Sequence, residues 1–186
     1  MAQPLPSASA AAQQKSYVTY TAPNANPNAP RITTLEAPSL LASSGTTGFR
    51  TWEAALHLGS YLVSEDGNHH VAGQRIIELG AGTGFLSILC AKHLGAGHVL
   101  ATDGSLEVVT DIKVNLDLNE LEEGDLIRTS VLQWGHALID CPADCRREGL
   151  SYGLAIGADV VGDTSSHQSP IAPINKLLAY HSVPSC

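Results

Sequence analysis

The sequence has few basic residues, few aromatic residues and no long apolar run. Its 186 residues include 10 lysines and arginines against 18 aspartates and glutamates, which gives a formal net charge of −8. We expect no nucleic-acid partner, because phosphate binding requires clustered lysine and arginine. We also expect no membrane association, because no apolar segment approaches the ~20 residues that a helix needs to span a bilayer.

Cysteine is also scarce in this chain. The four cysteines stand at positions 90, 141, 145 and 186, and only Cys141 and Cys145 are close in sequence. Without a second Cys or His pair at metal-ligand spacing, we predict no metal site and free thiols. The first twelve residues lack the basic residues and the long apolar stretch of a secretory signal. We therefore expect a cytoplasmic protein.

The length of the chain and its apolar content of 44% fit one α/β domain with a real core. Residues 1–15 are rich in Ala, Gln, Ser and Pro, which predicts a disordered arm. Residues 16–161 are predicted to form the folded domain, and residues 162–186 an atypical tail. Two β-branched and aromatic runs near the start of this domain, at 17–20 and 32–35, predict a short β hairpin.

The segment 75–86, which reads RIIELGAGTGFL, is the most informative part of the sequence. Its apolar residues predict a buried strand before the glycines and a helix after them. Glycine at positions 80, 82 and 84 permits positive φ and removes Cβ atoms, so a ligand can lie against the main chain. The alternative interpretation is an ordinary glycine-rich turn with a solvent-exposed glutamate.

Glu78 indicates which kind of cofactor suits this turn. It stands just before the first glycine, and the spacing Gly-x-Gly-x-Gly differs from the Gly-x-Gly-x-x-Gly of dinucleotide sites. A carboxylate at this position repels a pyrophosphate but attracts a cation. S-adenosylmethionine carries a sulfonium and an ammonium and no phosphate, so the turn favours it over NAD. An NAD-dependent oxidoreductase remains the alternative.

Three further strands are predicted to end near the same turn. The strand 98–103 ends at Asp103, about 20 residues beyond the glycines, where a carboxylate is expected to bind both ribose hydroxyls. The alternative for Asp103 is an acid at a helix N-terminus or a turn former. The strand 127–132 precedes Trp134, and the strand 152–161 carries Asp159. Since ligands of open α/β sheets bind beyond the carboxyl ends of the strands, these side chains are predicted to converge with Glu78.

Two amphipathic helices are predicted beside these strands. Apolar residues recur at helical spacing over 51–62, with Thr51 as the predicted N-cap. Residues 105–118 predict the second helix, with Asn115 on a polar face exposed to solvent. Trp52 is either a core anchor or a site residue, and Trp134 is either placed beside an adenine or an ordinary surface or core residue.

Taken together, these motifs resemble the seven-strand protein methyltransferases, and among them the eukaryotic lysine methyltransferases that modify elongation factors and chaperones. The resemblance covers residues 17–161 and is nearest to the group that methylates elongation factor 2. The matching segments, in order, are TGFRTWEAAL at 47–56, ELGAGTG at 78–84, ATD at 101–103, LQWG at 132–135 and GADV at 157–160.

The resemblance implies a Rossmann-like methyltransferase fold, S-adenosylmethionine as cofactor and a lysine side chain of elongation factor 2 as substrate. It implies that Asp159 is the catalytic residue and orients the substrate amine. The residues it implies to bind the cofactor are Trp52, Glu78, Gly80, Ala81, Gly82, Asp103, Trp134 and Ala158.

Two features depart from the family pattern. The family usually has Asp-x-x-Tyr after the fourth strand, whereas Asp159 is followed by Val160, Val161 and Gly162. Four strands of the central sheet are recognisable, so strands five to seven are expected to be missing and the chain to be truncated at its C-terminus. The alternative to a monomeric enzyme is therefore a remnant that binds cofactor or a partner protein without turnover.

Overall fold

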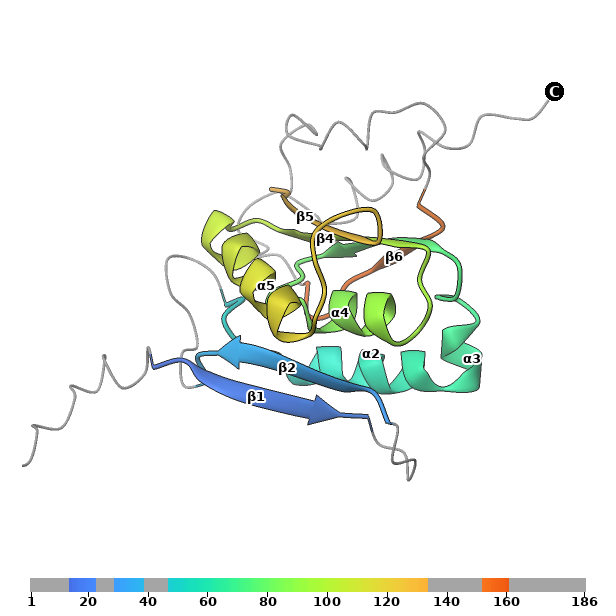
Figure 1. Cartoon of the computed structure of the whole chain (residues 1–186), viewed down its shortest axis with the longest axis horizontal. Coiled ribbons are helices and arrows are strands. Elements are labelled where there is room, and N and C mark those ends of the chain that lie inside the picture. The colour runs from blue at the N-terminus through green and yellow to red at the C-terminus, as the bar shows by residue number, and fades with distance from the viewer. Residues whose placement is uncertain (1–13, 23–28, 39–46, 134–151, 161–186) are drawn as a thin grey trace, which may run out of the picture.

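The computed structural model describes residues 14–22, 29–38, 47–133 and 152–160, which form a mixed α/β domain (Figure 1). The predicted fold class is therefore confirmed. Trp134 and the predicted tail lie outside the described residues, as does most of the predicted arm. In chain order the elements are β1 (Ser16–Thr21), β2 (Arg31–Glu36), α2 (Glu53–Val63), α3 (Glu65–Asn68), β3 (Arg75–Leu79), α4 (Phe85–Lys92), β4 (His98–Asp103), α5 (Leu106–Leu118), β5 (Ile127–Val131) and β6 (Leu154–Ile156).

The central sheet of the described residues has four parallel strands in the order β5–β4–β3–β6. Its two inner strands, β3 and β4, are buried along almost their whole length. Near-continuous apolar runs are typical of parallel strands that are covered on both faces. The predicted strand 98–103 matches β4 residue for residue, whereas β6 is shorter than the predicted strand 152–161.

The predicted N-terminal hairpin is confirmed. Strands β1 and β2 pair antiparallel, with Tyr17 opposite Leu35 and Tyr20 opposite Ile32. Burial alternates along β2, so that Ile32, Thr34 and Glu36 face the interior. Figure 1 shows the hairpin below α4 and α5, and β2 contacts both helices. The hairpin thus belongs to the layer that covers the sheet.

Helix α4 is the centre of the core. All its residues except Lys92 are buried, because it lies between the central sheet and a layer formed by the hairpin and α2 (Figure 1). Leu86 and Ile88 are fully buried there, and each such side chain contributes about 1.5–3 kcal/mol on burial. This packing fixes where the glycine turn, immediately before α4, meets the sheet.

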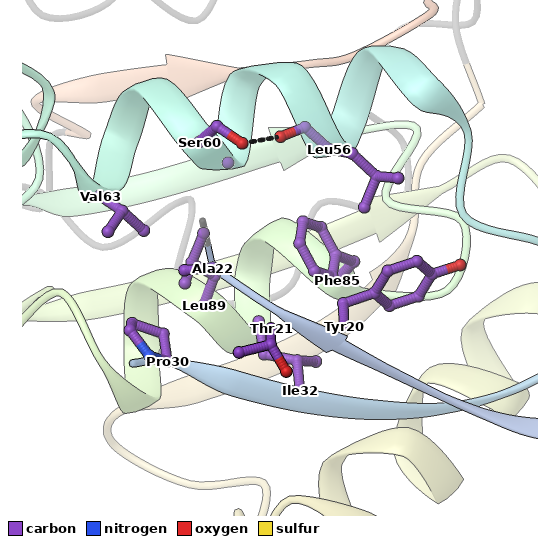
Figure 2. A pocket seen from close by; sticks show the side chains of 11 residues that line it. Tyr20, Thr21, Ala22, Pro30, Ile32, Leu56, Ser60, Val63, Phe85 and Leu89 are labelled. Atoms are coloured by element: carbon purple, nitrogen blue, oxygen red, sulfur yellow. Dashed lines mark hydrogen bonds between the residues drawn. The ribbon is translucent and has the colours of Figure 1, made fainter. Parts of the chain in front are cut away.

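A shallow apolar cavity of about 150 Å³ remains between the hairpin, α2 and α4 (Figure 2). Phe85 and Leu89 of α4 line one side of it, and Leu56 of α2 lines another. Tyr20 closes one end by an edge-to-face contact with Phe85, with ring centroids 5.3 Å apart. The cavity marks the seam where the hairpin packs against the two helices.

Two details of the predicted helices are wrong. Helix α2 begins at Glu53 with Trp52 as its N-cap. The hydroxyl of Thr51 does not cap the helix and instead bonds to Glu36 and Thr83. Asn115 is 1% exposed rather than on a solvated face. Its side chain accepts a hydrogen bond from the backbone N–H of Leu35 and donates one to the carbonyl of Thr83. Both differences arise from contacts with the hairpin.

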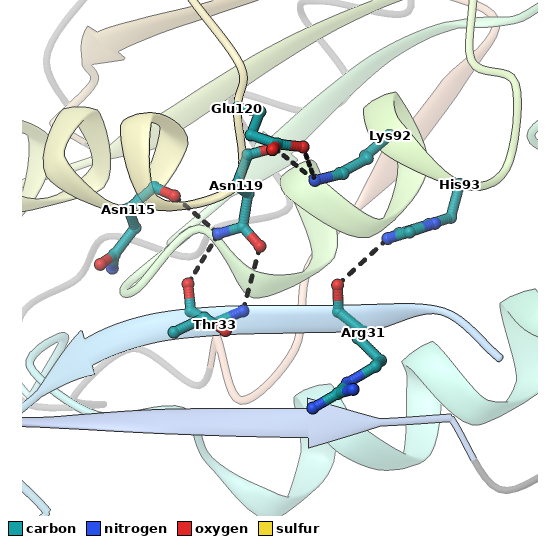
Figure 3. Close-up of polar contacts among 7 residues, drawn as sticks. All are labelled: Arg31, Thr33, Lys92, His93, Asn115, Asn119 and Glu120. Carbon is teal, nitrogen blue, oxygen red and sulfur yellow. Dashed lines mark hydrogen bonds and ion pairs between the residues drawn. The ribbon is translucent and has the colours of Figure 1, made fainter. Parts of the chain in front are cut away.

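Asn119, just beyond α5, forms a second link to the hairpin (Figure 3). Its amide nitrogen donates to the carbonyl oxygens of Thr33 and Asn115, and its Oδ1 accepts from the backbone N–H of Thr33. Lys92 of α4 donates to the carbonyl oxygen of Asn119. Among the described residues, β2 pairs with no strand except β1. Side-chain amides of Asn115 and Asn119 bind its main chain in addition to that pairing.

Candidate functional site

The glycine turn between β3 and α4 has the conformation that its sequence predicts. Gly80, Gly82 and Gly84 have φ values of 65°, 53° and 80°, a region that side chains other than glycine rarely occupy. The backbone N–H of Ala81 donates to the carbonyl of Thr102 at 2.8 Å, which ties the turn to β4. Gly84 is the N-cap of α4, so the turn leads directly into the helix.

Two of these glycines lie beside other segments of the chain, at different distances. A Cβ atom on Gly84 would lie 2.9 Å from Cγ2 of Ile112, which is too close. A Cβ atom on Gly82 would lie 3.5 Å from the carbonyl oxygen of Gly48, an ordinary contact distance. The segment that leads into α2 thus crosses close to the turn and forms one wall of the site.

Asp103 stands at the carboxyl end of β4 and connects the turn to α5. Its side chain accepts hydrogen bonds from the backbone N–H groups of Gly82 and Ser105, both at 3.1 Å. The turn-forming role is therefore realised. A carboxylate has about four acceptor positions, so these two bonds leave capacity for hydroxyl donors. The predicted contact with a ribose stays a prediction.

Glu78 is buried in β3 rather than exposed to solvent, so the alternative of a solvated glutamate is wrong. It is 3% exposed, and its carboxyl group accepts a hydrogen bond from the hydroxyl of Ser87 in α4. Burial is the main reason that the pKa of Glu78 is raised to about 7. The hydrogen bonds from Ser87 oppose this rise, and the charge of Asp103 adds a smaller upward contribution. An approaching cation would find a carboxyl group that ionises near neutral pH.

Trp52 lies half-buried at the start of α2 and is not part of the buried core. Its indole N–H donates to the carbonyl of Thr47 at 3.0 Å. The guanidinium of Arg50 lies 4.3 Å from the centre of its ring and also pairs with Glu53 at 2.9 Å. The ring is thus held in place while part of its surface remains accessible.

The end of β6 lies beside the end of β3. A Cβ atom on Gly157 would lie 3.3 Å from the carbonyl oxygen of Leu79, the residue before the turn. Ala158 packs against the main core, and Asp159 is exposed with a φ of 56°. Because the strands are parallel, Asp103 and Asp159 follow the same edge of the sheet that the turn occupies. Trp134 lies outside the described residues.

A buried polar cluster beside the turn has no signal in the sequence. The hydroxyl groups of Thr51 and Thr83 lie 2.7 Å apart, and Thr51 also donates to Glu36 at 2.6 Å. These three residues are separated by 15 and 32 positions in the chain. No local motif relates them, and only the packing of the hairpin on the turn brings them together.

The described residues contain neither a cluster of metal-ligating side chains nor a membrane-spanning helix. No three His, Cys, Asp or Glu side chains of residues 14–22, 29–38, 47–133 and 152–160 gather where they could hold a metal ion. In the same ranges, every helix is too short or too polar to cross a bilayer.

The sequence matches one protein family and is similar to several proteins. Residues 41–184 match the family described as lysine methyltransferase. The chain is 45% identical over 96% of its length to protein-lysine N-methyltransferase EFM3 of Chaetomium thermophilum, and 34% identical over 69% to EFM3 of Saccharomyces cerevisiae. It is 38% identical over 60% of its length to EEF1A lysine methyltransferase 3 of Mus musculus. These matches cover 53%, 39% and 43% of the respective relatives, so the chain spans about half their length or less.

Proposed function

The chain belongs to the lysine methyltransferase family, and on that premise we propose that it transfers a methyl group from S-adenosylmethionine to a lysine side chain of a protein. One observation carries the proposal. The bare glycine turn, with Gly82 bonded to Asp103 and Glu78 buried behind it, stands at the carboxyl edge of a parallel sheet. Ligands of such sheets bind at this edge.

The residues of the turn fit this cofactor in charge and in shape. Positive φ at Gly80 and Gly82 belongs to residues without side chains, so the cofactor can lie directly against the main chain. The remaining acceptor capacity of Asp103 suits the two hydroxyls of a ribose. Glu78 supplies a carboxyl group that suits the positively charged methionine end, and a pyrophosphate would be repelled there.

When bound, S-adenosylmethionine supplies an electrophilic methyl group on a sulfonium. The role of the protein is to hold the amine and the methyl donor in line, which can lower the reaction barrier by up to about 7–11 kcal/mol. In this proposal Trp52 and Ala158 border the donor, and Asp159 orients the amine by accepting its hydrogen bonds. A carboxylate raises the pKa of a neighbouring amine, so Asp159 acts as an orienting group and not as a strong base.

We propose translation elongation factor 2 as the substrate, with the chain acting as a cytoplasmic monomer. The support is the resemblance of the five sequence motifs to the group that methylates this factor. The names of two relatives, protein-lysine N-methyltransferase EFM3 and EEF1A lysine methyltransferase 3, agree on lysine as the acceptor. The second of these names a different elongation factor, so the test below measures transfer to elongation factor 2 directly.

The test incubates the purified chain with elongation factor 2 and methyl-labelled S-adenosylmethionine, followed by mass spectrometry of the labelled peptide. We expect label on one lysine. Asp103→Asn should weaken cofactor affinity by about 10- to 100-fold, the range for a hydrogen bond to a charged group. Asp125→Asn, at an exposed position, is the matched control and should bind cofactor as the unaltered chain does.

Two outcomes would contradict the proposal in different ways. Cofactor binding measured by calorimetry without any methyl transfer, to elongation factor 2 or to lysate proteins, would select the non-catalytic alternative. Transfer to another protein would retain the enzyme class and reject the proposed substrate.

A further inference from the structure

Glu36, at the end of β2, is a buried carboxylate that is fully engaged in hydrogen bonds. It is 2% exposed. Its Oε1 accepts from the hydroxyls of Thr34 and Thr51, both at 2.6 Å. Its Oε2 accepts from the backbone N–H of Thr51 at 3.1 Å and from the hydroxyl of Tyr20 at 3.2 Å. Four donors thus fill the acceptor capacity of one carboxylate.

Thr51 connects Glu36 to the glycine turn through its side-chain hydroxyl. A threonine hydroxyl has one hydrogen, and that of Thr51 is donated to Glu36. In the 2.7 Å contact between Thr51 and Thr83, the donor must therefore be Thr83. The hydrogen bonds therefore run in one direction, from Thr83 through Thr51 to Glu36. Consecutive hydrogen bonds of this kind polarise and strengthen one another.

Thr83 is also held from its other side. Its carbonyl accepts from the side-chain amide of Asn115, and Oδ1 of that amide accepts from the backbone N–H of Leu35 in β2. Thr83 itself is 4% exposed and lies between Gly82 and Gly84. Two separate routes thus lead from adjacent residues of β2 to the same residue of the turn.

We propose that Glu36 is a positioning residue for the methyl donor, through which the N-terminal hairpin fixes the glycine turn. The same carboxylate holds the backbone of Thr51, the neighbour of Trp52, so it sets two walls of the donor site at once. Glu36 acts through Thr51 and Thr83 and does not touch the reacting atoms. The link to the methyl donor rests on the proposed function, whereas the fixing of the turn does not.

The experiment compares Thr51→Val with Thr34→Val in the full chain. Both threonines are buried, both donate to the same oxygen of Glu36 at 2.6 Å, and both replacements keep the shape of the side chain. Only Thr51 also contacts Thr83. The pair therefore separates the loss of a buried hydrogen bond from the loss of the connection to the turn.

Two readouts are needed, and neither is methyl transfer. The first is hydrogen exchange, without ligand, of the backbone N–H groups of Gly82 and Gly84, which are bonded to Asp103 and Ala81 and report local opening of the turn. The second is the dissociation constant of S-adenosylhomocysteine by calorimetry. We expect Thr51→Val to raise the exchange rates and the dissociation constant by about tenfold, the factor that corresponds to 1.4 kcal/mol. Thr34→Val should leave the exchange rates and the dissociation constant within about twofold of the unaltered chain.

Thr51→Ser, which retains the hydroxyl, should restore both values. Equal exchange rates in Thr51→Val and Thr34→Val would overturn the positioning role, whether or not the ligand binds. If the unaltered chain fails to bind S-adenosylhomocysteine, the proposed function fails, and the exchange comparison still decides the role of Glu36. Circular dichroism confirms that each variant is folded before either comparison is made.

Discussion

At the scale of single residues, Glu78 couples the charge of the site to the stability of the fold. Its pKa of about 7 in the folded chain exceeds the ordinary value of 4.5, chiefly because of burial. Between these two values the folded chain holds a proton that the unfolded chain releases. The free energy of unfolding therefore falls as pH rises from 4.5 to 7, by up to about 3 kcal/mol from this one group.

The corresponding prediction concerns Glu78→Gln. The amide keeps the shape of the protonated side chain but cannot ionise, so the variant should gain stability relative to the unaltered chain as pH rises through this window. The measurement is urea unfolding at about pH 5, near the lower end of this window, and at about pH 8, above its upper end. Glu122→Gln, at an exposed position, is the control. A constant difference between Glu78→Gln and the unaltered chain at both pH values would refute the assignment of this titration to Glu78.

At the scale of elements, Gly84 in the turn between β3 and α4 is constrained both by its positive φ and by close packing. Two glycines outside the turn allow these constraints to be separated. Gly84 has a φ of 80° and also lies against Ile112, whereas Gly95 has a φ of 70° with nothing within 4 Å of an added Cβ atom. Gly124 has neither constraint. Alanine at position 84 should therefore cause both backbone strain and a steric clash, and alanine at position 95 should cause backbone strain alone. Alanine at position 124 should cause neither.

We predict a ranking for these three alanine variants. Gly124→Ala should change the free energy of unfolding by less than about 0.5 kcal/mol, and Gly95→Ala should lower it by about 1–2 kcal/mol through backbone strain. Gly84→Ala should lower it by about 1–3 kcal/mol more, because the core around Ile112 must shift. Denaturant unfolding measures all three, and a Gly84 variant no less stable than the Gly95 variant would contradict the packing argument.

The elements were predictable where their signals are local. The apolar run at 76–79 and the strand 98–103 each specify a buried strand within a few residues, and the glycines specify the turn between strand and helix. Asn115 and Thr51 were misassigned for the opposite reason. Their partners, Leu35 and Glu36, are 80 and 15 positions away, and a pattern of neighbouring residues carries no information about such contacts.

The same limit applies to the candidate site. Gly82 and Asp103 could be related from the sequence, because the strand–turn–helix topology brings the ends of adjacent parallel strands together. The cluster around Thr83 could not, since it depends on how a hairpin outside the central sheet packs on the turn. The sequence therefore relates residues at the ends of adjacent strands, such as Gly82 and Asp103, better than it relates the turn to the hairpin residues that hold it.

At the scale of the whole molecule, the proposed donor site lies where the layers of the fold meet. The hairpin holds the turn through Thr83, the sheet supplies Glu78 and Asp103, and the segment before α2 supplies Trp52. A ligand bound among these elements adds its binding energy to the cooperative stability of the described domain. A ligand that binds at this site should therefore raise the free energy of unfolding, and a ligand that does not bind should leave it unchanged.

The last prediction follows from this linkage and separates the two cofactor hypotheses. S-adenosylhomocysteine at about 100 times its dissociation constant should raise the free energy of unfolding by about 2.7 kcal/mol, whereas NAD should leave it unchanged because Glu78 opposes a pyrophosphate. Thermal unfolding followed by circular dichroism measures both, with adenosine as a control for the shared nucleoside. In Asp103→Asn the increment at the same ligand concentration should shrink, because the amide offers the proposed ribose one uncharged acceptor oxygen in place of a carboxylate. Stabilisation by NAD that exceeds that by S-adenosylhomocysteine would revive the oxidoreductase alternative, since the turn would then tolerate the charge that Glu78 is expected to exclude.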